Sequence, residues 1–147
     1  MKTINYIGIY LIFSLILFAV APLVMLYSDI EQEMVRLLIY FGCSGGIGGT
    51  IYCVKGFYKH LGEERFKPSW TWWYIFRPII SVMIGIFTYF LIVGGLISIS
   101  DCPDVNVEKN VMLYCAISFI AGFSFANFTS KVEDLSSTFL AGKKKEE

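Results

Sequence analysis

Four long apolar stretches, separated by short polar segments, set the hydrophobic pattern of this chain. None of them contains Asp, Glu, Lys, Arg or His, and each is close to the roughly 20 residues that an α-helix needs to cross the hydrocarbon core of a bilayer. They occupy residues 4–27, 37–54, 78–100 and 111–130. The pattern therefore predicts four transmembrane helices, and we expect their bounds at about 4–27, 34–55, 76–100 and 110–130.

Composition favours a membrane protein over a soluble one. Apolar residues make up 56% of the chain and charged residues only 16%, whereas an ordinary soluble domain carries about 25% charged residues. A chain of 147 residues is long enough for one domain and holds no further material that would cover four apolar helices. We therefore expect residues 1–147 to form a single all-α, polytopic integral membrane domain in the lipid bilayer. The formal net charge of zero gives no overall field that would attract nucleic acid.

Basic residues are distributed unequally between the two sides of this topology. Of the 12 Lys and Arg residues, only Arg36 and Lys109 fall on one side, and the rest belong to the N-terminus, the 55–77 loop and the C-terminal tail. Loops rich in Lys and Arg stay in the cytoplasm, so we expect a multi-pass protein of the inner cell membrane with both termini cytoplasmic. The opposite loops are acidic, and we expect an outer acidic mouth formed by Asp101, Asp104 and Glu108.

The stretch YFGCSGGIGGT, from Tyr40 to Thr50, concentrates glycines within the second predicted helix. It lacks the βαβ context that a dinucleotide-binding loop requires, so we expect no cofactor. Small residues three or four positions apart let membrane helices approach closely, but a face without side chains could also line a pore or permit a bend. Both alternatives stay open for the second-helix residues Gly42, Gly45, Gly46 and Gly49 and for the fourth-helix residues Ser118, Gly122 and Ala126.

Aromatic residues precede the third predicted helix, in the segment KPSWTWWYIFRPII. Trp and Tyr rings prefer the headgroup level of a bilayer, so we expect an interfacial anchor formed by Trp70, Trp72, Trp73 and Arg77. Pro78 suits the first position of a helix, because its missing N–H would have no partner there. An ion pair of Arg77 with Glu63 or Glu64 is the alternative role for this cation.

A further helical signal follows the fourth apolar stretch, in the sequence FTSKVEDLSSTFLAGKKKEE. Apolar residues recur there at the 3-4 spacing of an a/d seam. The residues of this predicted oligomer seam are Phe128, Val132, Leu135 and Phe139. The spacing predicts that the fourth helix extends into the cytoplasm as an amphipathic helix over 131–142, followed by a flexible tail over 143–147. This extension either pairs with copies of itself or lies on the inner leaflet.

Groups with catalytic or metal-binding chemistry are scarce. His60 is the only histidine and lies near Glu63 and Glu64, but zinc sites usually need three or four protein ligands. Coupled transporters usually keep ionisable residues at mid-membrane, and none falls within the four stretches. Hydroxyl groups in the stretches, such as those of Ser44 and Ser118, can bond to the backbone of their own helix. We therefore expect no enzyme activity, no cofactor and no catalytic or metal-binding residue.

The second half of the chain carries two short motifs, WWYIFRP before the third predicted helix and FIAGFSFANF near the end of the fourth. With these motifs the chain resembles small four-helix inner-membrane proteins of prokaryotes that have no assigned activity. The resemblance implies an inner-membrane location and carries no activity with it.

Two functions fit these features. The first is a homo-oligomeric, passive membrane channel, whose acidic outer mouth would give a preference for cations. The alternative is a membrane-embedded accessory or adaptor subunit that binds a partner protein through its glycine face and its cytoplasmic helix. The glycine face, the small residues of the fourth helix and the seam together predict a homo-oligomer.

Overall fold

The computed structural model describes residues 2–27, 32–63, 66, 68–95 and 111–141, and the described residues are helical almost throughout. The elements are α1 (Lys2–Tyr27), α2 (Glu33–Gly62), the short 3-10 helix η1 (Pro68–Trp70), α3 (Thr71–Val93), α4 (Val111–Phe123) and α5 (Phe125–Ala141). The prediction of an all-α fold is therefore confirmed for this part of the chain. Helices α1, α2 and α3 are each long and apolar enough to cross a membrane.

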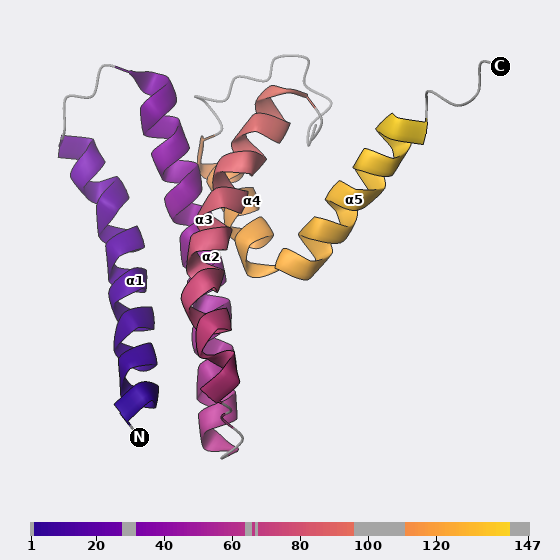
Figure 1. The fold of residues 1–147 in the computed structure, drawn as a ribbon. Coiled ribbons are helices and arrows are strands. Elements are labelled where there is room, and N and C mark those ends of the chain that lie inside the picture. Colours follow the sequence, from indigo (N-terminus) through magenta and orange to yellow (C-terminus); the bar gives the residue numbers. More distant parts are fainter. Residues whose placement is uncertain (1, 28–31, 64–65, 67, 96–110, 142–147) are drawn as a thin grey trace.

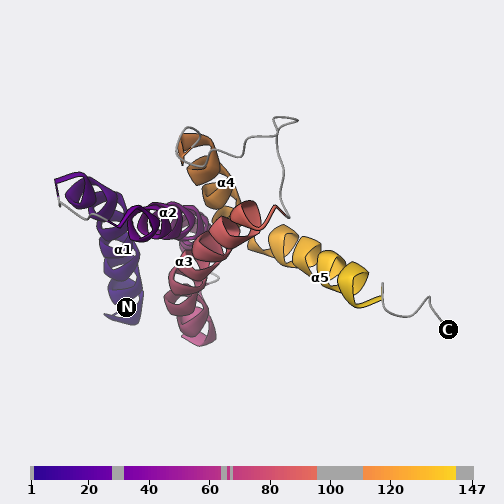
Figure 2. The same ribbon diagram turned by 90° about the horizontal axis from the view of Figure 1, so that it is seen from above.

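Helix α2 is the centre of the molecule, because α1, α3 and α4 all pack against it. Helices α1, α2 and α3 run up, down and up in Figure 1, and Figure 2 shows α2 between α1 and α3 when seen from above. We call the end at which α2 begins the Glu33 end, and the end at which α2 finishes and α3 begins the Trp70 end. The N-terminus of α1 lies at the Trp70 end.

Two apolar clusters lie toward the two ends of α2. The Leu37 cluster consists of Leu37, Phe41, Tyr89, Ile92 and Tyr114, and it joins α2, α3 and α4 near the Glu33 end. The Cys53 cluster consists of Ile7, Leu11, Cys53 and Tyr74, and it joins α1, α2 and α3 near the Trp70 end. By contrast, most of the outward face of α1 is apolar and exposed, as expected for a helix that contacts lipid.

The bounds of α2 and α3 differ from those predicted. Helix α2 continues past residue 55 to Gly62, since Lys55 and Lys59 end the apolar stretch but are good helix formers. Helix α3 begins at Thr71 instead of residue 76, so Pro78 is its eighth residue and not its first. This interior proline denies the Tyr74 carbonyl its usual helical donor. At the other end α3 stops at Val93.

A glycine pair ends α3. The Gly94 N–H donates to the Phe90 carbonyl, and Gly95 has a φ of 72°, in the left-handed region that only glycine adopts without strain. The third helix was predicted to continue to residue 100, but it ends before Gly94. Residues 96–100 lie outside the described residues.

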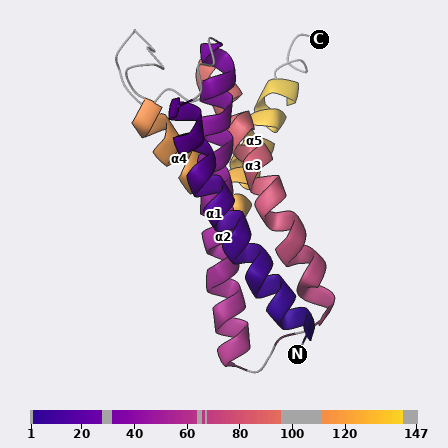
Figure 3. The same ribbon diagram turned by 90° about the vertical axis from the view of Figure 1, so that its left-hand side faces the viewer.

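The prediction of one unbroken helix over 110–130 that continues into an extension over 131–142 is wrong in its continuity, although the extension itself is helical as far as Ala141. Two helices replace it, α4 and α5, and they meet at Ser124 with a bend of 101°. Together they could count as a fourth membrane crossing only as a bent pair. Figures 1 and 3 show α4 descending from the Glu33 end to the middle of α2, and α5 leaving the bundle obliquely and turning back toward that end.

The bend coincides with close packing of the last turn of α4 against α3, where Ser81 donates to the Arg77 carbonyl of its own helix at 2.9 Å. The Gly122 carbonyl, which would accept the Ala126 N–H in an unbroken helix, lies 3.4 Å from the Ser81 hydroxyl of α3. A side chain that enters the helical hydrogen-bond ladder is an established cause of a kink. The helix restarts directly afterwards, with the Phe128 N–H donating to the Ser124 carbonyl.

Candidate functional site

Glycines bring α2, α3 and α4 together at one crossing, which we call the glycine crossing. A Cβ atom on Gly45 of α2 would lie 2.6 Å from the Ser81 carbonyl oxygen and 2.8 Å from the Gly85 Cα of α3. A Cβ on Gly122 of α4 would overlap the Gly45 carbonyl. Backbones approach this closely only when both sides lack a side chain.

The predicted glycines and Ala126 divide into three groups. Gly45, Gly49 and Gly122 lie at the crossing, where an added Cβ would meet backbone atoms or Ser81. Gly42 and Gly46 instead face flexible side chains, those of Ile86 and of Val82 and Phe18 respectively. Ala126 is exposed and lies in α5 beyond the bend, so it does not continue a face with Ser118 and Gly122.

Two further glycines belong to the crossing although sequence analysis did not single them out for it. A Cβ on Gly48 would overlap the Phe119 carbonyl of α4, and one on Gly85 would overlap the Phe41 carbonyl of α2. Gly48 stands in the same glycine-rich stretch, but it faces α4 while Gly45 faces α3. Within one subunit, the glycine face of α2 is thus filled by two neighbouring helices.

Serine hydroxyls tie the same helices together. Ser44 of α2 donates to the Cys115 carbonyl of α4 at 2.5 Å, and Ser118 of α4 donates back to the Phe41 carbonyl of α2 at 2.7 Å. These two hydroxyls thus bond to a neighbouring helix and not to their own, whereas Thr50 donates within α2 to the Gly46 carbonyl at 2.7 Å. Hydroxyl bonds between apolar helices hold them in one register, because the alternative is an unpaired polar group.

Arg77 of α3 lies next to the bend, in contact with α2 and with the first residue of α5. Only 8% of its surface is exposed, and its Nε is buried without a hydrogen-bond partner among the described residues. Its guanidinium carbon lies 5.0 Å from the ring centre of Tyr52, 5.7 Å from that of Trp73 and 4.4 Å from that of Phe125. Three aromatic rings therefore surround this cation. Glu64 lies outside the described residues, and the ion pair with Glu63 or Glu64 stays a prediction.

These contacts make Arg77 the fastening point of α5. Side chains of a helix lean toward its N-terminus, which brings the guanidinium of Arg77 back toward Trp73, one turn earlier. Phe125 is the first residue of α5, so the cation holds the start of α5 against α2 and α3. A desolvated cation–π contact of this kind is worth about 2 kcal/mol. We call Arg77, Tyr52, Trp73 and Phe125 the elbow site.

Arg77 and Trp73 could be predicted from the sequence as site residues, whereas Tyr52 and Phe125 could not. Both are aromatic residues among many, and they lie 25 and 48 positions from Arg77 in the chain, so no local spacing connects them to it. The other predicted anchor residues differ in their surroundings. Trp72 is 66% exposed and stacks on Phe76, whereas the Trp70 ring packs against His60 at 4.5 Å.

A second polar feature lies at the Trp70 end. His60, Trp70, Trp73 and Tyr74 line a cavity of about 280 Å³, and Nδ1 of His60 is buried with no hydrogen-bond partner in the described part of the chain. Among the described residues there is no group of three His, Cys, Asp or Glu side chains that could hold a metal ion. Glu63 is exposed, and Glu64 lies outside the described residues.

Helix α5 carries the predicted seam. Phe128, Val132 and Leu135 are half-buried, whereas Lys131 and Glu133 are exposed. Among the described helices, α4 is the main neighbour of α5. Arg77 of α3 also contacts Phe125, the first residue of α5. The side chain of Phe139 and the predicted acidic mouth, Asp101, Asp104 and Glu108, lie outside the described residues.

Comparison of the chain with models of known protein families, with curated protein sequences and with solved structures found no match. The resemblance to small four-helix proteins of prokaryotes therefore stays a prediction. What the chain does has to be inferred from its own geometry.

Proposed function

We propose that this chain is a membrane-embedded accessory subunit that holds a partner protein through α5. In this proposal α1, α2 and α3 cross the inner membrane and anchor the chain, and the elbow site fixes where α5 begins. The observation that carries the proposal is that α5 projects from the bundle (Figures 1 and 2). Its apolar row, Phe128, Val132 and Leu135, is only half-buried. An amphipathic helix exposed in this way is a common means of docking into an apolar groove.

The glycine crossing supports this function over a pore within one subunit. The face of α2 that has no side chains is occupied by the backbones of α3 and α4, and Ser44 and Ser118 bond across it. This face therefore stabilises the anchor itself. The apolar row on α5 is a predicted interaction surface that other helices of the subunit cover only in part, so a partner protein could bind to it.

Copurification from native membranes tests the proposal. The unmodified chain and a Val132→Ser/Leu135→Ser variant are extracted in nanodiscs and weighed by native mass spectrometry. We expect a single partner in fixed stoichiometry with the unmodified chain, and its loss from the variant. Glu133→Gln, on the opposite side of α5, is the matched control and should retain the partner. Isolation of the unmodified chain alone, or as a homo-oligomer only, would contradict the proposal.

A homo-oligomeric passive channel is the second candidate, and the bend between α4 and α5 favours it. Helix ends at membrane depth are tolerated where protein or a water-filled cavity covers them. Any pore would have to lie between subunits, because the glycine face is filled within each one. The same mass measurement distinguishes the candidates: a ring of four or more copies would support a channel. Asn substitutions at Asp101, Asp104 and Glu108 should then reduce its cation preference.

Both termini are cytoplasmic in this proposal, as the distribution of basic residues favours. That orientation puts the Glu33 end on the outer side, whereas α5 turns back toward this end in Figure 1. It therefore requires α4 and α5 to act as one bent crossing with α5 directed toward the Trp70 end, so the side on which α5 ends is decisive. Ser137→Cys, in a chain whose Cys102 is replaced by Ser, should react with a membrane-impermeant thiol reagent only after the cytoplasmic side is opened. Labelling of Cys at position 137 from outside intact cells would instead make α4 and α5 a re-entrant pair.

A further inference from the structure

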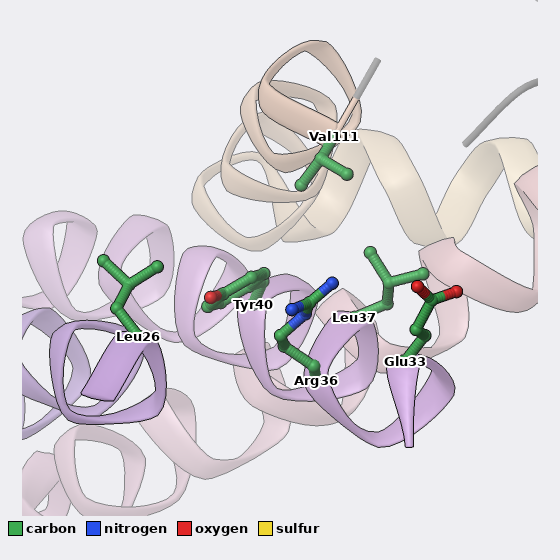
Figure 4. Close-up of a pocket in the computed structure, with 6 residues that line it drawn as sticks. All are labelled: Leu26, Glu33, Arg36, Leu37, Tyr40 and Val111. Carbon is green, nitrogen blue, oxygen red and sulfur yellow. The ribbon is translucent and has the colours of Figure 1, made fainter. Parts of the chain in front are cut away.

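A cavity of about 360 Å³ lies at the Glu33 end, far along α2 from the elbow site. Its walls come from three helices: the last turn of α1, the first two turns of α2 and the first residue of α4 (Figure 4). The lining residues are Leu26, Glu33, Arg36, Leu37, Tyr40 and Val111. Neither proposed function makes use of this cavity.

The lining has two chemically different parts. Leu26 of α1, Leu37 of α2 and Val111 of α4 supply apolar walls from three different helices. Glu33 and Arg36 supply opposite charges three residues apart on α2, and such residues are neighbours on a helix surface. Figure 4 shows the Glu33 carboxylate and the Arg36 guanidinium both pointing toward the side on which Val111 lies.

Tyr40 extends the polar part by one turn. It follows Arg36 by four residues, so both lie on the same face of α2, and its ring stands between Leu26 and Arg36 in Figure 4. A tyrosine with an apolar ring and a polar hydroxyl is suited to the boundary between hydrocarbon and headgroups. The cavity also lies where the apolar stretch of α1 ends and those of α2 and α4 begin, which is the expected level of that boundary.

We propose that this cavity binds the headgroup of a zwitterionic phospholipid. The planar guanidinium of Arg36 matches two phosphate oxygens, and the carboxylate of Glu33 matches the ammonium group. The acyl chains would leave along the apolar side formed by Leu26 and Val111. Ligand cavities commonly measure about 300–1,000 Å³, so a cavity of this size suits a headgroup and not a whole lipid.

Opposite charges make a specific prediction about lipid selectivity. A site that used Arg36 alone would prefer an anionic phospholipid, because the guanidinium would repel the ammonium group of a zwitterionic headgroup. With Glu33 next to Arg36, an anionic headgroup lacks the ammonium that offsets this carboxylate. The pair therefore favours a lipid that carries both charges, and removal of Glu33 should reverse that preference.

Native mass spectrometry of the full chain tests this site. The chain is reconstituted in nanodiscs with equal amounts of phosphatidylethanolamine and phosphatidylglycerol, and the lipid retained after gas-phase release is identified. We expect one retained phosphatidylethanolamine per chain. Arg36→Gln should lower the retention of both lipids about tenfold, the order expected for loss of one charge-assisted hydrogen bond. Glu33→Gln should lower retention of phosphatidylethanolamine only.

Two controls keep the result interpretable. Glu33 and Arg36 are both exposed, so neither substitution should unfold the chain, and circular dichroism checks this. Lys59→Gln, at the Trp70 end, removes a charge from the same helix and should leave lipid retention unchanged. Soluble glycerophosphoethanolamine at the same concentration should not compete, since it lacks acyl chains. Competition by glycerophosphoethanolamine would show that the ligand is a soluble zwitterion and would overturn the assignment to a lipid. If the Glu33→Gln chain retained each lipid to the same extent as the unmodified chain does, the proposed site would be overturned.

Discussion

The glycine crossing and helix α5 look alike in one respect: each is a regular spacing of residues that predicts contact with another helix. The structure treats them differently. At the crossing, Gly45, Gly85 and Gly122 bring three helices of the same chain to backbone contact. Along α5, Val132 and Leu135 stay half-buried and α4 is the main neighbour among the described residues. The first pattern therefore builds the subunit, while the second leaves a surface for something outside it.

The largest effect should come from filling the crossing. Gly45→Ala places a Cβ 2.6 Å from the Ser81 carbonyl oxygen and 2.8 Å from the Gly85 Cα. These are backbone atoms, which cannot move away by a change of rotamer as a flexible side chain can. We expect a loss of about 1–3 kcal/mol in the free energy of unfolding, as for other overpacked sites. Denaturant unfolding of the detergent-solubilised protein, followed by circular dichroism, measures it.

Gly56→Ala is the matched control for this prediction. It lies in the same helix, but its added Cβ would meet only the Tyr74 hydroxyl, at 3.7 Å. Alanine is the better helix former by about 1 kcal/mol, so this variant should be as stable as the unmodified chain or more so. If both variants behaved alike, the close approach of α2 and α3 at Gly45 would be in error.

A more local effect, confined to the junction of the two regions, should follow from changing Arg77. Arg77→Met removes the cation that contacts Tyr52, Trp73 and Phe125, worth about 2 kcal/mol where it is desolvated. The start of α5 should then be held less tightly. Spin labels at positions 59 and 136, measured by pulsed electron paramagnetic resonance, should give a broader distance distribution.

Arg77→Lys sharpens this test. Lysine keeps the charge but lacks the planar group that stacks on aromatic rings, so it should restore the narrow distribution only in part. A distribution that is as narrow in Arg77→Met as in the unmodified chain would show that α5 is held by α4 alone. The Gly122 carbonyl and Ser81 would then be the main determinants of the bend.

The smallest effect on stability should come from α5 itself. Leu135→Ser removes an apolar side chain from a helix that packs mainly on α4, so the free energy of unfolding should change by less than about 0.5 kcal/mol. The same unfolding measurement as for Gly45→Ala checks this. A loss comparable with that of Gly45→Ala would mean that α5 belongs to the core of the subunit, and the distinction between the two regions would fail.

Much of the fold could be predicted because helices long and apolar enough to cross a membrane can be recognised from consecutive residues. The uninterrupted apolar stretches located α1, α2, α3 and the start of α4, since a helix that satisfies its own backbone needs only length and apolar composition. The limits of the helices were less accurate. Lys55 and Lys59 end an apolar stretch without ending α2, and Pro78 is accommodated inside α3 although it suits a first position.

The candidate site was predictable only in part. Arg77 stood out as a charge beside an apolar stretch, and the glycine spacing indicated close contact. Their partners did not stand out, because Tyr52 and Phe125 belong to other helices and have nothing unusual in their own neighbourhoods. The cavity at the Glu33 end was missed for the same reason: Leu26, Arg36 and Val111 come from three helices.

The sequence by itself thus determined the all-α class, the apolar helices, the unequal distribution of basic residues and the presence of small residues able to bring helices together. These are properties of consecutive residues and need no knowledge of what lies opposite. Only the tertiary structure decided where α4 ends, because the fourth apolar stretch continues unbroken through Ser124 while Ser81 of α3 lies against the Gly122 carbonyl. The direction of α5 depends on that contact and on Arg77. The Ser81–Gly122 contact joins residues more than 40 positions apart, and Arg77 joins three helices at once.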